Sequence, residues 1–260
     1  MKRMPAITVS EAQLAAWTGA FFWPLVRILA LLGTAPAFSH QAIPVRAKVA
    51  FGVAIALVIA PTVQSPPLGN ALDGVFFEIL VRNILVGATL GFAVRALFSG
   101  VEFAGEVIGL EIGMSFGGFY NPEMPETDTP VTNLVSLLVL LLFLTMNGHL
   151  MLLAALRRSF DVFPVAGGGS HQIAFDVLAG LGKQVFSIAL SVSLPILATM
   201  FLINLILGIM ARVSPQLNLF AVGFPITLSG GLLLLAVFLP YLEEPIRRAL
   251  EQALAIWPQG

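Results

Sequence analysis

Cysteine is absent from this 260-residue sequence, and histidine occurs only three times. Without cysteine the chain can form no disulfide and can offer no thiolate to a metal and no thiol nucleophile. The three histidines, His40, His149 and His171, are scattered along the chain rather than set at the spacing of a metal motif. We therefore expect no metal site and no cofactor.

Charged residues are also scarce. They make up 10% of the chain, against roughly 25% in ordinary soluble domains, whereas hydrophobic residues make up 58%. The formal net charge is -1, and no basic stripe is present that would bind nucleic acid. The composition predicts a protein whose apolar surfaces are covered by membrane lipid or by partner subunits.

The amino-terminal segment has a basic start and an apolar run that ends near Ala35, which resembles a secretory signal. Pro24 and Arg27 interrupt that run, and Glu11 precedes it. The central region of a signal peptide is short and uncharged. We therefore expect this segment to remain in the mature protein.

Six apolar runs have about the 20-residue length that a helix needs to cross a hydrocarbon core. Turn-forming residues separate them, so the sequence predicts an all-α protein built from hydrophobic helical hairpins. The runs are Ala15–Gly33, Val45–Val63, Val75–Phe98, Leu134–Leu156, Val185–Met210 and Phe224–Leu239.

Several of these runs contain polar residues that a helix surrounded by lipid would avoid. A charge near the middle of a bilayer costs roughly 2.5–3.5 kcal/mol on insertion scales, so such residues usually face protein or water. Arg82 and Arg95 can also extend their charged ends to a membrane surface, whereas Arg27 lies deep in its run. The polar residues are Arg27, Arg82, Asn83, Arg95, Asn147, His149 and Asn204.

The distribution of lysine and arginine favours a topology with both chain termini in the cytoplasm. Arg157, Arg158 and Lys183 then lie on the inner side. The acidic connection between the third and fourth runs lies outside, although Arg46 and Lys48 on an outer loop oppose this assignment.

A glycine stripe precedes the central connection. Gly105, Gly109 and Gly113 recur at four-residue spacing within Val101–Gly113, which predicts a shorter amphipathic helix with one face of nearly bare backbone. Such a face permits the close approach of another helix. Close packing within the chain and contact with another subunit both remain possible from the spacing alone.

An apolar, glycine-containing loop follows the stripe. Paired glycines permit unusual backbone angles, and methionine and phenylalanine are bulky and adaptable. Such a loop inside a pore could seal it and still move aside for a polymer; the alternative is an ordinary loop packed into the core. The residues concerned are Met114, Ser115, Phe116, Gly117, Gly118, Phe119 and Tyr120.

Two further motifs suggest helix packing or subunit assembly. Between the last two runs, Arg212 offsets a helix dipole and polar side chains near Pro215 can bond free carbonyls. In Asn147-Gly148-His149, a packing contact is favoured over a proton relay. The residues predicted for packing or assembly also include Gln216, Asn218, Gly223 and Pro225.

The sequence Arg-Val-Ser-Pro-Gln-Leu-Asn-Leu-Phe at Arg212–Phe220, followed by Gly-Phe-Pro at Gly223–Pro225, closely resembles the FliR family. This family provides the export-gate subunit of flagellar type III secretion and is related to the SctT/SpaR-type proteins of injectisomes. The resemblance extends over nearly the whole chain. Further matches lie at Arg27, Pro36, Pro44, Arg46, Gly113–Pro122 and Phe143–His149.

The resemblance implies a single export-gate domain over residues 1–260, with halves 1–132 and 133–260. It implies no enzymatic activity, assembly with FliP and FliQ, and contact with the export components FlhA and FlhB. The substrates are unfolded flagellar proteins, and the location is the flagellar basal body in the bacterial inner membrane. In this family the loop that matches Met114–Tyr120 plugs the closed gate.

Three alternatives remain. The nearest is an injectisome export-gate homologue with different cargo. A small transporter or channel acting alone is also compatible with broken helices and intramembrane charges, although no inverted halves are evident. A membrane enzyme would need a nucleophile with a base or metal ligands at suitable spacing, and the sequence has no such constellation.

Overall fold

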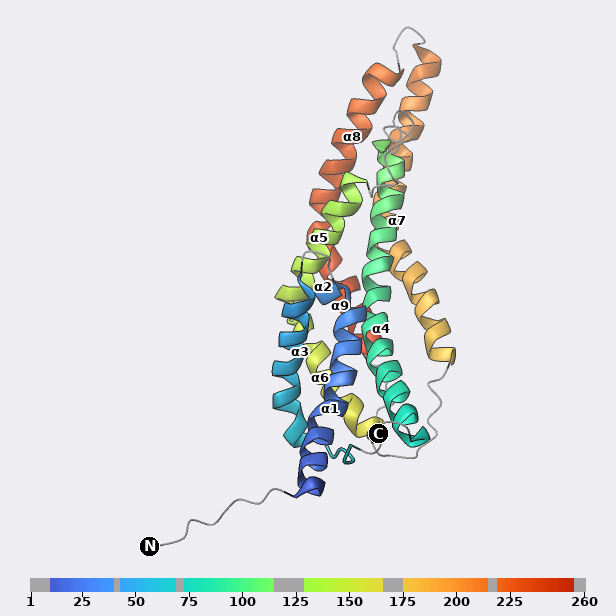
Figure 1. The fold of residues 1–260 in the computed structure, drawn as a ribbon. Helices are drawn as coiled ribbons and strands as arrows, with labels where there is room; N and C mark the ends of the chain where they lie inside the picture. Colours follow the sequence, from blue (N-terminus) through green and yellow to red (C-terminus); the bar gives the residue numbers. More distant parts are fainter. Residues whose placement is uncertain are drawn as a thin grey trace, which may run out of the picture. The chain divides into compact units, whose positions relative to one another are not determined.

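The computed structural model describes residues 10–39, 43–68, 73–114, 129–165, 175–214 and 219–254. Every regular element in these ranges is a helix, which confirms the all-α prediction (Figure 1). The α-helices are α1 (Glu11–Thr34), α2 (Pro36–Ser39), α3 (Val45–Ile59), α4 (Gly74–Ile112), α5 (Pro130–Thr145), α6 (Gly148–Val162), α7 (Phe175–Val213), α8 (Leu219–Phe238) and α9 (Glu243–Leu254). Two 3₁₀ turns, η1 (Ala60–Thr62) and η3 (Leu239–Leu242), follow α3 and α8.

Five helical segments among the described residues are long and apolar enough to cross a membrane. A sixth results if α5 and α6 count together as one broken span, so the prediction of about six long apolar helices is confirmed. The five segments are Gln13–Thr34, Val45–Thr62, Gly74–Ile112, Gly180–Val213 and Val222–Leu254.

The glycine-containing segment at Val101–Gly113 is not a separate short helix as expected. Residues Val101–Ile112 form the last turns of α4, which continues over 39 residues. No proline interrupts α4, and its glycines each cost only about 1 kcal/mol of helix propensity, which close packing can offset. The expected boundary after Phe98 therefore does not exist.

The expected continuous run Leu134–Leu156 is instead broken between α5 and α6. Asn147 has a φ of 57°, a left-handed conformation that asparagine adopts more readily than most residues. Gly148 follows because a Cβ there would lie 2.5 Å from a ring carbon of Phe143. The Asn-Gly pair is a turn signal within an apolar run.

The carboxy-terminal half also departs from the expected boundaries. Helix α7 begins at Phe175, before the expected Val185, and continues through Pro195. Helix α9 was not predicted, because its amphipathic sequence contains no long apolar run. Its buried side chains recur at helical spacing, and they are Ile246, Ala249, Leu250 and Ala253.

The chain divides into two compact units. The first contains Met1–Arg95, Leu150–Val177 and Leu254–Gly260, and the second contains Ala96–His149 and Leu178–Ala253. Each unit thus combines segments that are distant in the sequence. The prediction of one export-gate domain over the whole chain remains a prediction.

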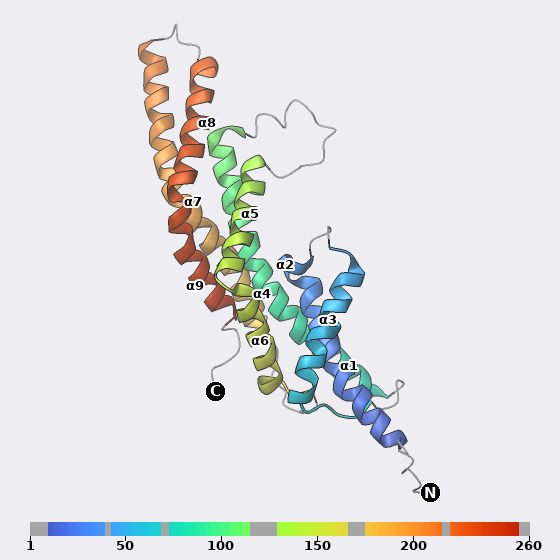
Figure 2. The same ribbon diagram turned by 90° about the vertical axis from the view of Figure 1, so that its left-hand side faces the viewer.

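In the first unit α1 and α3 lie side by side, and α4 approaches α1 closely (Figures 1 and 2). A Cβ on Gly87 of α4 would lie only 2.2 Å from the carbonyl oxygen of Arg27. A Cβ on Gly91, one turn later, would lie 2.8 Å from the carbonyl oxygen of Leu31. Glycine at these positions therefore lets the two backbones touch.

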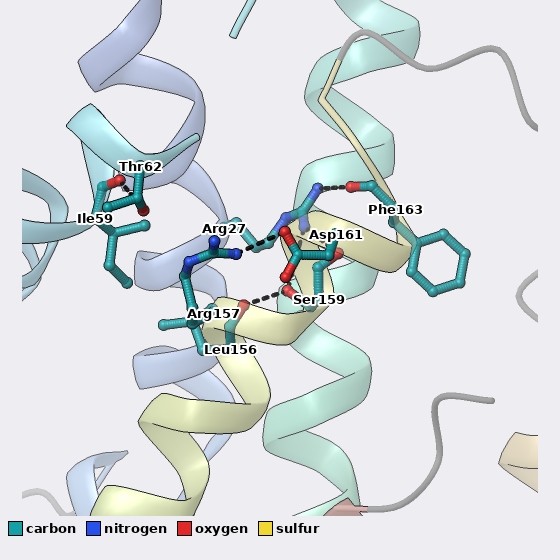
Figure 3. A network of polar contacts seen from close by, with 8 residues as sticks. All are labelled: Arg27, Ile59, Thr62, Leu156, Arg157, Ser159, Asp161 and Phe163. Carbon is teal, nitrogen blue, oxygen red and sulfur yellow. Dashed lines mark hydrogen bonds and ion pairs between the residues drawn. The ribbon is translucent and has the colours of Figure 1, made fainter. Parts of the chain in front are cut away.

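Arg27 is fully buried in the first unit, which confirms the prediction that it faces protein. Its Nε donates to Oδ1 of Asn83 at 3.0 Å, and its Nη1 donates to the carbonyl oxygen of Ser159 at 2.8 Å. Its Nη2 donates to the carbonyl oxygen of Phe163 at 2.8 Å, as Figure 3 shows. The Phe160 ring lies under the guanidinium, with its centroid 4.0 Å from Cζ.

These bonds join α1 to α4 and to the carboxy-terminal end of α6. The carbonyls of the last helical turn have no partner within their own helix, and a cation there also offsets the helix dipole. Arg27 fills both roles for α6 from a neighbouring helix. The Asn83 side chain is fixed in turn, because its Nδ2 donates to the carbonyl oxygen of Ile79 at 2.8 Å.

The second unit has its own internal contacts. The Phe98 and Phe143 rings meet edge to face with centroids 5.7 Å apart, which joins α4 to α5. Phe103 and Phe186 make a similar contact at 5.8 Å between α4 and α7. Gln184 of α7 donates to the carbonyl oxygen of Ala249 in α9 at 3.0 Å.

We expect Arg27→Met to destabilise the protein by about 3–5 kcal/mol, because it leaves buried carbonyl and amide oxygens without donors. Detergent-solubilised full-length chain, unfolded by denaturant and followed by circular dichroism, measures the change. The control is Arg46→Met, at an exposed position of α3, for which we expect a change below about 0.5 kcal/mol. Equal stability of the two variants would contradict the role assigned to Arg27.

Candidate functional site

The predicted sealing loop lies almost entirely outside the described residues. Met114 is described, whereas Ser115, Phe116, Gly117, Gly118, Phe119 and Tyr120 are not. The structure does describe the two helix ends that carry residues 115–128. We call these ends the loop anchor: the end of α4 at Gly105–Gly113 and the start of α5 at Thr129–Thr132.

The glycine stripe of α4 packs against the start of α5. A Cβ on Gly109 would lie 2.7 Å from Oγ1 of Thr129, and a Cβ on Gly105 would lie 3.0 Å from Cα of Thr132. A larger side chain at Gly105 would meet the backbone of α5 rather than a movable side chain. Of the two possibilities that the spacing left open, packing within the chain is therefore observed for these two glycines.

Helix α5 has a well-defined beginning. The Thr129 hydroxyl accepts a hydrogen bond from the Thr132 backbone N–H at 3.2 Å, and its backbone is extended, as an N-cap requires. Pro130 occupies the first helical turn, where its fixed φ suits the helix and its missing N–H costs nothing. The hydroxyls of Thr129 and Thr132 also lie 2.9 Å apart within hydrogen-bonding distance.

Helix α4 ends equally sharply. Gly113 has a φ of 93°, a conformation that costs glycine little, and its N–H donates to the carbonyl oxygen of Leu110 at 3.0 Å. A left-handed residue just beyond a helix is a frequent stop signal. The third glycine of the stripe therefore ends the helix, whereas the other two permit helix packing.

Two contacts hold the end of α4 against the α7–α8 hairpin. Asn204 of α7 donates from Nδ2 to Oε1 of Glu111 at 2.8 Å. A Cβ on Gly231 of α8 would lie 2.3 Å from Cγ1 of Ile112, so the absence of a side chain there admits Ile112. The α4 end of the loop anchor is thus held by contacts with α5, α7 and α8.

The remaining predicted assembly residues are distributed over several helices. Arg212 lies in the last turn of α7 and is exposed, and Gly223 and Pro225 lie in α8. Pro215, Gln216 and Asn218 lie outside the described residues. Their role in assembly remains a prediction.

The Asn147-Gly148-His149 motif lies at the break between α5 and α6. Asn147 is exposed, and His149 is half-buried. The Nδ1 atom of His149 is buried and has no hydrogen-bond partner within the described part of the chain. The structure therefore explains Asn147 and Gly148 by the helix break, and the packing role predicted for His149 remains a prediction.

Several residues of the loop anchor were not predicted from the sequence. Thr129-Pro130 is a recognisable helix start, because an N-cap residue is followed by proline at the first helical position. Gly231 and the pairing of Glu111 with Asn204 have no comparable signal, since they depend on which helices become neighbours.

Comparison with known proteins identifies the family. The family model described as "Bacterial export proteins, family 1" matches residues 18–253. The flagellar biosynthetic protein FliR of Pectobacterium carotovorum subsp. carotovorum is 39% identical over 236 residues, which cover 90% of this chain and 89% of that protein. The chain belongs to the FliR family of bacterial export proteins.

Other FliR-family members match over similar lengths. The flagellar biosynthetic protein FliR of Escherichia coli K12 is 37% identical over 90% of this chain and 89% of that protein. The protein of the same name from Bacillus subtilis 168 is 28% identical over 88% of this chain and 89% of that protein. All the elements of the loop anchor lie within the residues that the family model matches.

The loop anchor predicts that Gly109→Cys with Thr129→Cys forms a disulfide. A Cβ on residue 109 would lie 3.4 Å from Cβ of Thr129, close to the roughly 3.5–4.5 Å that disulfides require. The natural chain has no cysteine, so mild oxidation can form only the designed bridge within one chain. Mobility on non-reducing gels and intact mass measure its yield.

The matched control combines Gly109→Cys with Thr145→Cys, at the opposite end of the 16-residue α5. That end lies about 24 Å from the start of the helix, so we expect no intramolecular bridge. Similar oxidation yields for the two pairs would contradict the observed packing of α4 on α5.

Proposed function

We propose that this chain is a core export-gate subunit of the flagellar type III protein secretion apparatus. The observation that carries the proposal is its similarity, over nearly the full length of both chains, to proteins named flagellar biosynthetic protein FliR. In this proposal the chain is not an enzyme and needs no cofactor. It forms, with FliP and FliQ, the pore through which unfolded flagellar proteins leave the cytoplasm.

The proposed closing element is the loop that contains Phe116 and Phe119. What supports it is the apolar, glycine-containing sequence of residues 114–120 together with the anchor at both of its ends. Because contacts among methionine and phenylalanine are soft and non-directional, they can open for a passing polymer and form again. Gly117 and Gly118 provide the backbone freedom for that movement.

The proposed partners FliP and FliQ would cover helix surfaces that a bilayer cannot cover alone. The apolar segment Gly180–Val213 has 34 residues, so it is about 50 Å long as a helix. The hydrocarbon core is about 30 Å thick, and a tilt of up to about 40° does not bring the whole segment within it. Exposed apolar side chains nevertheless continue along α7 from Phe186 to Val213.

The proposed location is the bacterial inner membrane, at the flagellar basal body, with FlhA and FlhB as neighbouring export components. The long apolar helices support a membrane location, and the similarity to FliR proteins supports the flagellar system. Within this assembly, Arg212, Gln216 and Asn218 are proposed to stabilise the last hairpin or its contact with FliQ.

If residues 114–120 close the pore, replacing both Phe116 and Phe119 with alanine should make the membrane permeable to small solutes. The expected increase arises because two large apolar side chains no longer fill the closed path. Uptake of a small membrane-impermeant dye by secreting cells, or conductance of the reconstituted complex, measures the leak.

The matched control is Phe77→Ala with Phe92→Ala, two exposed phenylalanines on α4 outside the loop. These changes should leave permeability at the wild-type level. Unchanged permeability of a fully assembled Phe116→Ala/Phe119→Ala complex would refute the plug assignment.

Deletion of this gene should abolish swimming and the export of flagellar filament protein, and a plasmid copy should restore both. The tagged chain should also co-purify with FliP and FliQ in one complex. A swimming deletion strain that fails to secrete virulence substrates would instead identify the chain as an injectisome homologue. A stable, solute-binding protein without partners would identify a transporter.

A further inference from the structure

An apolar groove lies between α3 and α6 in the first unit. It has a volume of about 550 Å³, within the range of ligand-binding pockets. Val58 at its edge is 73% exposed, so the groove opens to the outside of this unit. The lining residues are Ala54, Ile55, Val58, Ile59 and Thr62 from α3 and η1, and Leu153, Ala154 and Arg157 from α6.

The polarity of this groove changes along its length. On each of the two helices that line it, the first lining residue has a purely apolar side chain: Ala54 on α3 and Leu153 on α6. The residues that come last, Thr62 and Arg157, offer a hydroxyl and a guanidinium. The groove therefore has an apolar body and a cationic mouth. These two features complement an amphipathic ligand that has an apolar chain and an anionic end.

The depth of the mouth fits the surface of a membrane. The segment Val45–Thr62 is 18 residues long and apolar enough to cross a bilayer. At about 1.5 Å per residue it measures about 27 Å, close to the roughly 30 Å of the hydrocarbon core. Thr62 ends this segment, so a bilayer spanned by Val45–Thr62 would have its headgroups at the level of the groove's polar mouth.

The mouth of the groove carries one guanidinium, that of Arg157. Arg157 donates from Nη1 to Oδ1 of Asp161 at 2.7 Å, as Figure 3 shows, and both side chains are partly exposed. A guanidinium has five N–H donors, so this ion pair leaves others for a second oxygen ligand.

We propose that the groove binds an anionic phospholipid, with one acyl chain along Val58 and Ala154 and the headgroup phosphate on Arg157. Arginine is well suited to phosphate because its planar donors match two oxygens at once. The topology predicted from lysine and arginine assigns this site to the cytoplasmic leaflet. The inference requires only that the first unit lies in a bilayer and does not depend on the export function.

The test measures retained lipid by native mass spectrometry. The full chain, purified with its associated subunits, is incubated with equal amounts of phosphatidylglycerol and phosphatidylcholine. We expect preferential retention of phosphatidylglycerol by the wild type. Arg157→Gln should lower its affinity about fivefold, the change that corresponds to the ~1 kcal/mol contributed by one arginine at a membrane surface. Ala154→Trp should abolish retention by filling the groove.

Two matched controls separate the site from general effects. Arg248→Gln removes an exposed arginine that forms a similar ion pair with Glu244 on α9, and Ala50→Trp adds a bulky side chain to an exposed position of α3 outside the groove. Both should retain phosphatidylglycerol as the wild type does. Equal retention by all variants, or equal retention of the two lipids by the wild type, overturns the proposal.

A photo-crosslinking residue at Val58 tests the alternative that a protein helix fills the groove. Membranes are prepared from cells that express the chain with p-benzoylphenylalanine at position 58. After irradiation, we expect the mass of the chain to increase by the mass of a phospholipid. An adduct with another polypeptide overturns the lipid assignment and identifies the groove as a subunit interface.

Discussion

The fully buried guanidinium of Arg27 is the interaction on which the first unit depends. It donates to α4 through Asn83 and to the end of α6 through the carbonyls of Ser159 and Phe163. A cation that cannot reach water is stable only if its donors are used, so each partner must hold its position. The three helices are therefore specified jointly, which hydrophobic contacts alone would not achieve, because apolar packing tolerates many arrangements.

Close glycine contacts are the second constraint, and they act in both units. Where lipid surrounds a helix, apolar side chains gain little by leaving it for another helix, so association depends on close packing and hydrogen bonds. Gly87 lets α4 touch α1, and Gly105 lets α4 touch α5. The polar bonds of Arg27 and of Asn204 then select one arrangement among the close-packed ones. A chain without cysteine has no covalent alternative for this purpose.

Local signals in the sequence predicted the long helices, from the length of the apolar runs, and the inward position of Arg27, from the cost of a charge within such a run. The break at Asn147 was missed although Asn-Gly is a turn signal, since the apolar run around it is continuous. Helix α9 was missed because its apolar residues are spaced rather than consecutive. The partners of Arg27 and the contact of Gly231 with Ile112 could not be predicted, since both depend on three-dimensional neighbours far apart in the sequence.

The anchor limits where movement can occur if residues 114–120 close a pore. Its α4 end is held by Asn204 and Gly231, and its α5 end is held by the contacts at Gly105 and Gly109. Moving either helix would break several of these contacts at once, whereas moving the residues between them breaks none. Opening would therefore be confined to the loop itself, while the helices stay in place.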